Sequence, residues 1–113
     1  MNDERRAAPR IPVPLPIEVT DSITGEPIGR VGNLSRNGMM LISQRALHDG
    51  ALYQLHFRLP GAAGASDEIE AGVHSMWLAK AATNGYEWAG MRIISISNDA
   101  AERLDHWLER NAA

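Results

Sequence analysis

The sequence predicts an all-β domain with one terminal helix, folded as a six-stranded antiparallel β-barrel plus a C-terminal α-helix. Two observations indicate this architecture. Short apolar or alternating segments recur along most of the chain with turn residues between them, and only the C-terminal stretch has helical spacing. Short strands at such spacing typically close into a small barrel. The length of 113 residues fits one domain.

The first strand is expected at residues 11–20, where apolar side chains occupy the odd positions from Ile11 to Val19. Pro12, Pro14 and Pro16 occupy even positions between them. Because proline has no N–H, three successive donors are missing along one side of this strand, and we expect that side to be unpaired or loosely paired. Residues 1–10 are expected to form a flexible arginine arm, and residues 11–113 the folded domain.

Five further strands follow in order, separated by turn-forming residues. They are expected at residues 28–34, 39–43, 51–59, 69–79 and 86–96. Polar and glycine-containing turns separate them at residues 21–27, 35–38, 60–66 and 83–85. In the strand at 51–59 the residues Tyr53, Leu55, Phe57 and Leu59 share one face, so this face is predicted to point into the core.

A helix is expected from Asp99 to about Arg110. Residues 99–102 read Asp-Ala-Ala-Glu, a capping-box pattern that predicts Asp99 as the N-cap. Leu104, Trp107 and Leu108 then form one apolar stripe. Because the stripe is narrow, the helix is expected to pack over a mouth or flank of the barrel, with Trp107 as its anchor.

Composition excludes several classes of protein. The absence of cysteine excludes disulfide scaffolds and thiolate metal sites, and no apolar run reaches the roughly 18 residues that span a bilayer. We therefore expect a cytoplasmic domain without membrane insertion. The formal net charge of -3 argues against a nucleic-acid polymer as partner. Locally the charge differs, because Arg5, Arg6 and Arg10 lie together near the N-terminus.

Hairpin spacing brings this arginine arm towards a second polar cluster. If residues 11–20 and 28–34 pair around a turn centred near Thr24, residues equidistant from Thr24 lie opposite each other. Arg10 and Gly38 are both fourteen residues from that centre. The arm and the turn at residues 33–38 are therefore predicted to meet at one end of the barrel. A bulge in the hairpin would shift this register by one or two residues.

The residue types at this meeting point suit an anionic purine nucleotide. Arg6 and Arg10 carry guanidinium forks that match phosphate and guanine geometry. Asn33 can hydrogen-bond a base edge or hold the turn, and Ser35 carries a hydroxyl that is able to reach a phosphate oxygen. Gly38 permits a close approach of backbone to ligand.

These residues resemble the two motifs of the PilZ domain family. Residues 6–10, Arg-Ala-Ala-Pro-Arg, match RxxxR, and residues 33–38, Asn-Leu-Ser-Arg-Asn-Gly, match [D/N]xSxxG. The resemblance implies a barrel with a C-terminal helix that binds the bacterial second messenger cyclic di-GMP. It further implies that the RxxxR arginines hold guanine and phosphate groups and that the second motif completes the pocket. The ligand-binding residues carried over are Arg6, Arg10, Asn33, Ser35 and Gly38.

Two further arginines extend this set. The resemblance implies that Arg5, just before RxxxR, influences whether one nucleotide or an intercalated pair is bound. Arg36, inside the second motif, is predicted to be solvated or to add a phosphate contact. Asn33 is the less common residue at its motif position, and it removes a negative charge that would otherwise face an anionic ligand.

Other functions are less well supported by the sequence. The four histidines have no metal-ligand spacing, and Ser35 has no nucleophile-elbow pattern, so we expect neither a metal, a cofactor nor an enzyme. A small RNA-binding barrel would need a basic groove with aromatic platforms. The alternative left open is a PilZ-fold protein–protein adaptor that does not depend on the nucleotide. In either case the protein partner is an effector that the sequence does not identify.

Overall fold

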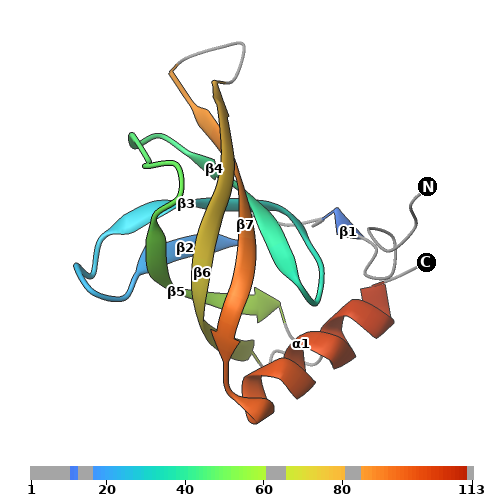
Figure 1. Cartoon of the computed structure of the whole chain (residues 1–113). Coiled ribbons are helices and arrows are strands. Elements are labelled where there is room, and N and C mark those ends of the chain that lie inside the picture. The colour runs from blue at the N-terminus through green and yellow to red at the C-terminus, as the bar shows by residue number, and fades with distance from the viewer. Residues whose placement is uncertain (1–10, 13–16, 61–65, 81–84, 112–113) are drawn as a thin grey trace.

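A computed structural model describes residues 11–12, 17–60, 66–80 and 85–111 of the chain (Figure 1). Each segment with strand periodicity contains a strand within these residues, the first of them as two short strands, and the C-terminal segment forms a helix. The strands are β1 (Ile11–Pro12), β2 (Glu18–Asp21), β3 (Pro27–Leu34), β4 (Gly38–Ser43), β5 (Leu52–Pro60), β6 (Ser66–Lys80) and β7 (Glu87–Ile96), and the helix is α1 (Asn98–Asn111).

Six of these strands close into an antiparallel barrel. The hydrogen-bonded order runs β3–β2–β5–β6–β7–β4, and β4 pairs again with β3 to complete the ring. The short strand β1 pairs with the far end of β3. The predicted fold class, a six-stranded barrel with one C-terminal helix, is confirmed. Figure 1 shows α1 lying across one end of the barrel.

The register of the first predicted strand is partly wrong. Glu18 pairs with Arg30, as the hairpin centred on Thr24 requires. Ile11, however, pairs with Leu34, three residues earlier along β3 than the count predicts. Between Pro12 and Glu18 the chain advances six residues while its partners on β3 advance only three. Residues 13–16, which include Pro14 and Pro16, lie outside the described residues. In the observed register β1 lies beside the start of the 33–38 turn.

The core follows the predicted alternation. On β5 the side chains of Leu55, Phe57 and Leu59 are buried, Tyr53 packs against the core, and the residues between them face outwards. This burial of alternate apolar side chains from all six barrel strands is the main stabilising contribution, at roughly 1.5–3 kcal/mol for each large side chain.

The helix begins two residues earlier than a helix capped by Asp99 would. The hydroxyl of Ser97 accepts a hydrogen bond from the backbone N–H of Ala100 at 3.1 Å, so Ser97 is the N-cap and the prediction of Asp99 is wrong. Asp99 lies instead in the first turn, where its negative charge interacts favourably with the helix dipole. Leu104 and Trp107 are buried as expected, and the Trp107 indole N–H donates to the carbonyl of Pro60 at 3.0 Å.

Candidate functional site at the turn between strands β3 and β4

The turn between β3 and β4 is organised by the side chain of Ser35. This residue is only 2 % exposed. Its Oγ accepts hydrogen bonds from the backbone N–H groups of Asn37 (3.3 Å) and Gly38 (3.2 Å) and donates to the carbonyl of Gly38 at 3.3 Å. The Ser35 hydroxyl therefore forms hydrogen bonds within the turn and stabilises its backbone conformation. A contact between Ser35 and a phosphate stays a prediction.

Gly38 is required by the barrel itself. A Cβ atom at this position would lie 2.2 Å from the carbonyl oxygen of Met91 on β7, a distance at which the backbone must move. Gly38 pairs with Arg92, and the carbonyl of Asn37 accepts a hydrogen bond from the N–H of Ile93 at 2.7 Å. The glycine thus allows β4 to start in close contact with β7, whether or not a ligand also approaches it.

Asn33 lies on β3 where two other strands meet. It pairs with Pro12 of β1 on one side and with Met40 of β4 on the other, and it is half-buried. Because its neighbour Leu34 is fully buried, alternation places Asn33 on the outer side of the barrel. The structure therefore brings Asn33, Ser35 and Gly38 together within one turn.

A groove opens directly beside this turn. Its volume is about 450 Å³, within the range of small-molecule sites. The lining residues are Asn37, Met76, Trp77, Gly90, Met91, Arg92 and Ile93.

Trp77 and Arg92 give this groove its chemistry. The indole of Trp77 lies over Gly90, because a Cβ at Gly90 would meet the indole nitrogen at 2.1 Å. Trp77 is still 45 % exposed, and Arg92 is exposed where β7 pairs with Gly38. An aromatic face and a guanidinium therefore adjoin the turn. Neither residue was predicted as part of the site. Trp77 lies opposite Gly90 only in the register that β6 and β7 adopt, and spacing along the chain does not give that register.

The predicted arginines are divided between described and undescribed residues. Arg36 is exposed at the rim of the turn, with its Nε 3.7 Å from Oδ1 of Asp105 on α1. Arg5, Arg6 and Arg10 lie outside the described residues, so their contribution stays a prediction.

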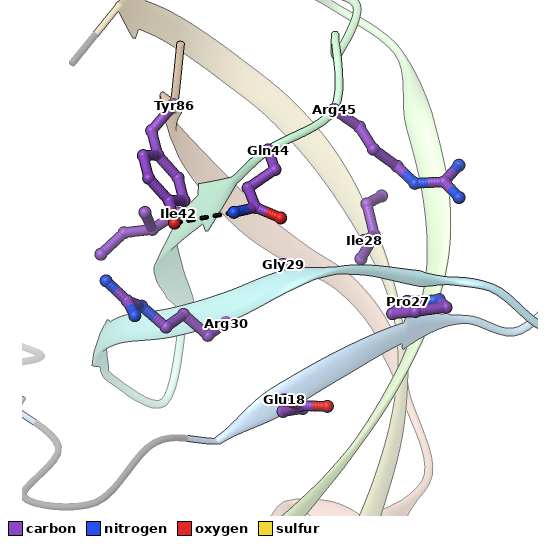
Figure 2. A pocket seen from close by; sticks show the side chains of 9 residues that line it. All are labelled: Glu18, Pro27, Ile28, Gly29, Arg30, Ile42, Gln44, Arg45 and Tyr86. Carbon is purple, nitrogen blue, oxygen red and sulfur yellow. Dashed lines mark hydrogen bonds between the residues drawn. The ribbon is translucent and has the colours of Figure 1, made fainter. Parts of the chain in front are cut away.

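A second groove lies further along the outer side of β3 and β4 (Figure 2). It has a volume of about 360 Å³. The amide of Gln44 donates to the hydroxyl of Tyr86 at 2.7 Å, and Arg45 forms an ion pair with Glu26 nearby. Figure 2 shows the side chains of Arg30 and Tyr86 on its rim. Of the described motif residues, Asn33, Ser35 and Gly38 are not among its lining residues.

A third groove, of about 420 Å³, carries a surface charge network. Hydrogen bonds from Arg58, and secondly from His56, hold the pKa of Glu68 below its ordinary value. The distances are 2.6 Å from Arg58 Nη2 and 3.0 Å from His56 Nε2. Within the described residues, histidine and the acidic side chains form no group of three suited to a metal ion. Among the described residues, the one helix, α1, is too short and too polar to cross a membrane.

Comparison with known proteins identifies a family for this chain. The family model for the PilZ domain matches residues 4–110. No curated protein matches the chain.

Solved structures with a similar fold include an inhibitor of motility and a cyclic di-GMP complex. The Bacillus subtilis inhibitor of motility, MotI/DgrA, aligns with a TM-score of 0.75 and 17 % identity over 96 % of this chain and 52 % of its own. Escherichia coli YcgR in complex with cyclic di-GMP aligns with a TM-score of 0.71 and 22 % identity, over 96 % and 47 %. The chain thus spans about half the length of these two proteins. The PilZ domain of YcgR with cyclic di-GMP aligns with a TM-score of 0.69 and 20 % identity, over 96 % and 94 %.

Proposed function

Since the chain belongs to the PilZ domain family, we propose that it is a non-enzymatic receptor for cyclic di-GMP. The ligand would bind across the turn at residues 33–38. The observation that carries the proposal is this turn, in which the second motif of the family is held rigid by a buried serine hydroxyl beside a groove with an aromatic face and a guanidinium. Similar folds have been solved with cyclic di-GMP bound, which supports the choice of ligand.

Each part of the nucleotide finds a suitable group. Arg6 and Arg10 supply bidentate donors for guanine edges and phosphates, and Arg5 adds a third positive charge. The backbone of the 33–38 turn offers a fixed edge, and Asn33 presents an amide beside it. Trp77 supplies an aromatic face of the kind on which a purine ring stacks.

Binding would act on a partner through the N-terminal arm. In this proposal residues 1–10 dock onto the 33–38 turn only when the nucleotide neutralises their charge, and the ordered arm and ligand together form a new surface. An effector protein would recognise that surface. The setting proposed is the bacterial cytoplasm, where the ligand is a second messenger.

Calorimetric titration of the full chain with cyclic di-GMP tests the function. A bidentate arginine–guanine contact is worth roughly 1–3 kcal/mol, so Arg6→Ala or Arg10→Ala should each weaken binding about tenfold or more. Arg45→Ala is the matched control, because Arg45 pairs with Glu26 away from the turn and should leave the affinity unchanged. If the wild type gives no heat at high micromolar nucleotide, the proposal is wrong and a nucleotide-independent adaptor becomes the better description.

A further inference from the structure

Arg36 belongs to the 33–38 turn, and its side chain is exposed while the backbone of the turn is held by hydrogen bonds. Its neighbours Ser35 and Gly38 are buried, and the hydroxyl of Ser35 fixes the turn. The Arg36 side chain itself is 64 % exposed. Its guanidinium can therefore exchange partners without any change in the barrel.

The present partner of Arg36 belongs to the C-terminal helix. Asp105 on α1 places Oδ1 at 3.7 Å from Arg36 Nε. Elsewhere, hydrogen bonds hold α1 to strands β5 and β6. The Trp107 indole donates to the carbonyl of Pro60 on β5, and the guanidinium of Arg103 donates to the carbonyl of Glu68 on β6. Figure 1 shows the β3–β4 turn descending towards α1. The ion pair thus connects the candidate ligand-binding turn to the helix.

We propose that Asp105 and a phosphate of the bound nucleotide compete for the Arg36 guanidinium, so that ligand binding releases α1 from the 33–38 turn. The inference rests on the proposed function, because it needs an anionic ligand at this turn. It assigns Arg36 a role in affinity and Asp105 a role as a positioning residue that acts through Arg36.

The sign of the effect follows from electrostatics. The carboxylate of Asp105 partly neutralises Arg36 and also repels an approaching phosphate, so it opposes binding in both ways. The present ion pair is weak, because Arg36 Nε and Asp105 Oδ1 are 3.7 Å apart and both side chains are exposed. A phosphate that accepts two parallel N–H bonds from the guanidinium would replace it with a stronger contact. By thermodynamic linkage, the ion pair between Arg36 and Asp105 lowers the affinity for the nucleotide, and the bound nucleotide weakens the contact between turn and helix by the same free energy.

A double-mutant cycle on cyclic di-GMP affinity tests the proposal. Asp105→Asn should tighten binding by roughly two- to fivefold, the range that exposed ion pairs span. Arg36→Ala should weaken it, and Asp105→Asn should have little further effect in the Arg36→Ala background. Asp105→Glu should restore wild-type affinity. In the wild type, the Arg36 side-chain N–H resonance should move on titration with the nucleotide.

Glu109→Gln is the control for general charge. Glu109 lies one turn after Asp105 on α1 and is exposed. Its neutralisation should change affinity much less than Asp105→Asn does. Equal effects of the two substitutions, weaker binding by Asp105→Asn, or the same gain with Arg36 absent would overturn the competition while leaving the receptor function intact. Absence of nucleotide binding by the wild type would overturn both.

Discussion

Substitution of Gly38 by alanine tests whether the last residue of the second motif serves the barrel as well as the ligand. The added Cβ would meet the carbonyl oxygen of Met91 at 2.2 Å, its carbonyl carbon at 3.2 Å and Cα of Arg92 at 3.3 Å. All three are backbone atoms of β7, so no side-chain rotation relieves the overlap. The strands β4 and β7 must separate locally, and the hydrogen bond between Ile93 and Asn37 lies next to the separation.

The expected cost of Gly38→Ala is about 2–3 kcal/mol, at the upper end of the range for overpacking in a folded core. For a domain of this size that corresponds to a melting temperature lower by roughly 10 °C. Thermal unfolding without any nucleotide, followed by circular dichroism, measures it. The absence of ligand matters, because a purely ligand-facing glycine would show no effect under these conditions.

Gly72→Ala is the matched control. Its Cβ would come no closer than 3.3 Å, to Oε1 of Gln54, which can rotate away, and to Cβ of Ser95, so a shift of a few tenths of an ångström is enough. We expect it to change stability by less than about 1 kcal/mol, as a tolerated small-to-large change does. If Gly38→Ala melts at the wild-type temperature, or no lower than Gly72→Ala, the close approach of β4 to β7 is not what requires the glycine.

Two further predictions concern stability. Ser43 is fully buried, its hydroxyl donates to the carbonyl of Ile28 at 2.5 Å and accepts from the N–H of Arg45 at 3.0 Å, so Ser43→Ala should lower the free energy of unfolding by about 1–3 kcal/mol in urea titrations. An unchanged urea midpoint would show that water replaces the hydroxyl. The pKa of Glu68 is lowered in the folded state by Arg58 and His56, so its contribution is present above the unfolded pKa near 4.5 and is lost as the pH falls through the folded pKa. Glu68→Gln should therefore reduce the loss of stability on acidification below pH 4.5, and an identical acid limb for both proteins would contradict this.

Much of the fold could be predicted because its information is local. A period of two along each strand and a helical stripe at the C-terminus are properties of neighbouring residues, and they assigned the faces of β5 and α1 correctly. Closure into a barrel followed from the number and spacing of strands. The second motif was found in the same way, since Asn33, Ser35 and Gly38 lie within six residues.

The two wrong predictions are the N-cap of α1 and the register of β1, where more than one local arrangement fits the sequence. Serine and aspartate are both favourable N-cap residues. Which of Ser97 and Asp99 caps α1 depends on where β7 ends and the helix begins. The register of β1 differs from the hairpin count by three residues, because the strand and its partner advance unequally between Pro12 and Glu18. Neither outcome is encoded in spacing alone.

The strands, the helix and the motif residues could be assigned from the sequence, since backbone preference and side-chain chemistry belong to each residue. The contacts of those residues became known from the folded chain. Gly38 faces the backbone of Met91, Trp77 covers Gly90, and Arg36 meets Asp105, although each pair is separated by many positions in the chain. The physical reason is that such contacts depend on the pairing of every strand between them, and a shift of one residue in a single pair would send a side chain to the opposite face.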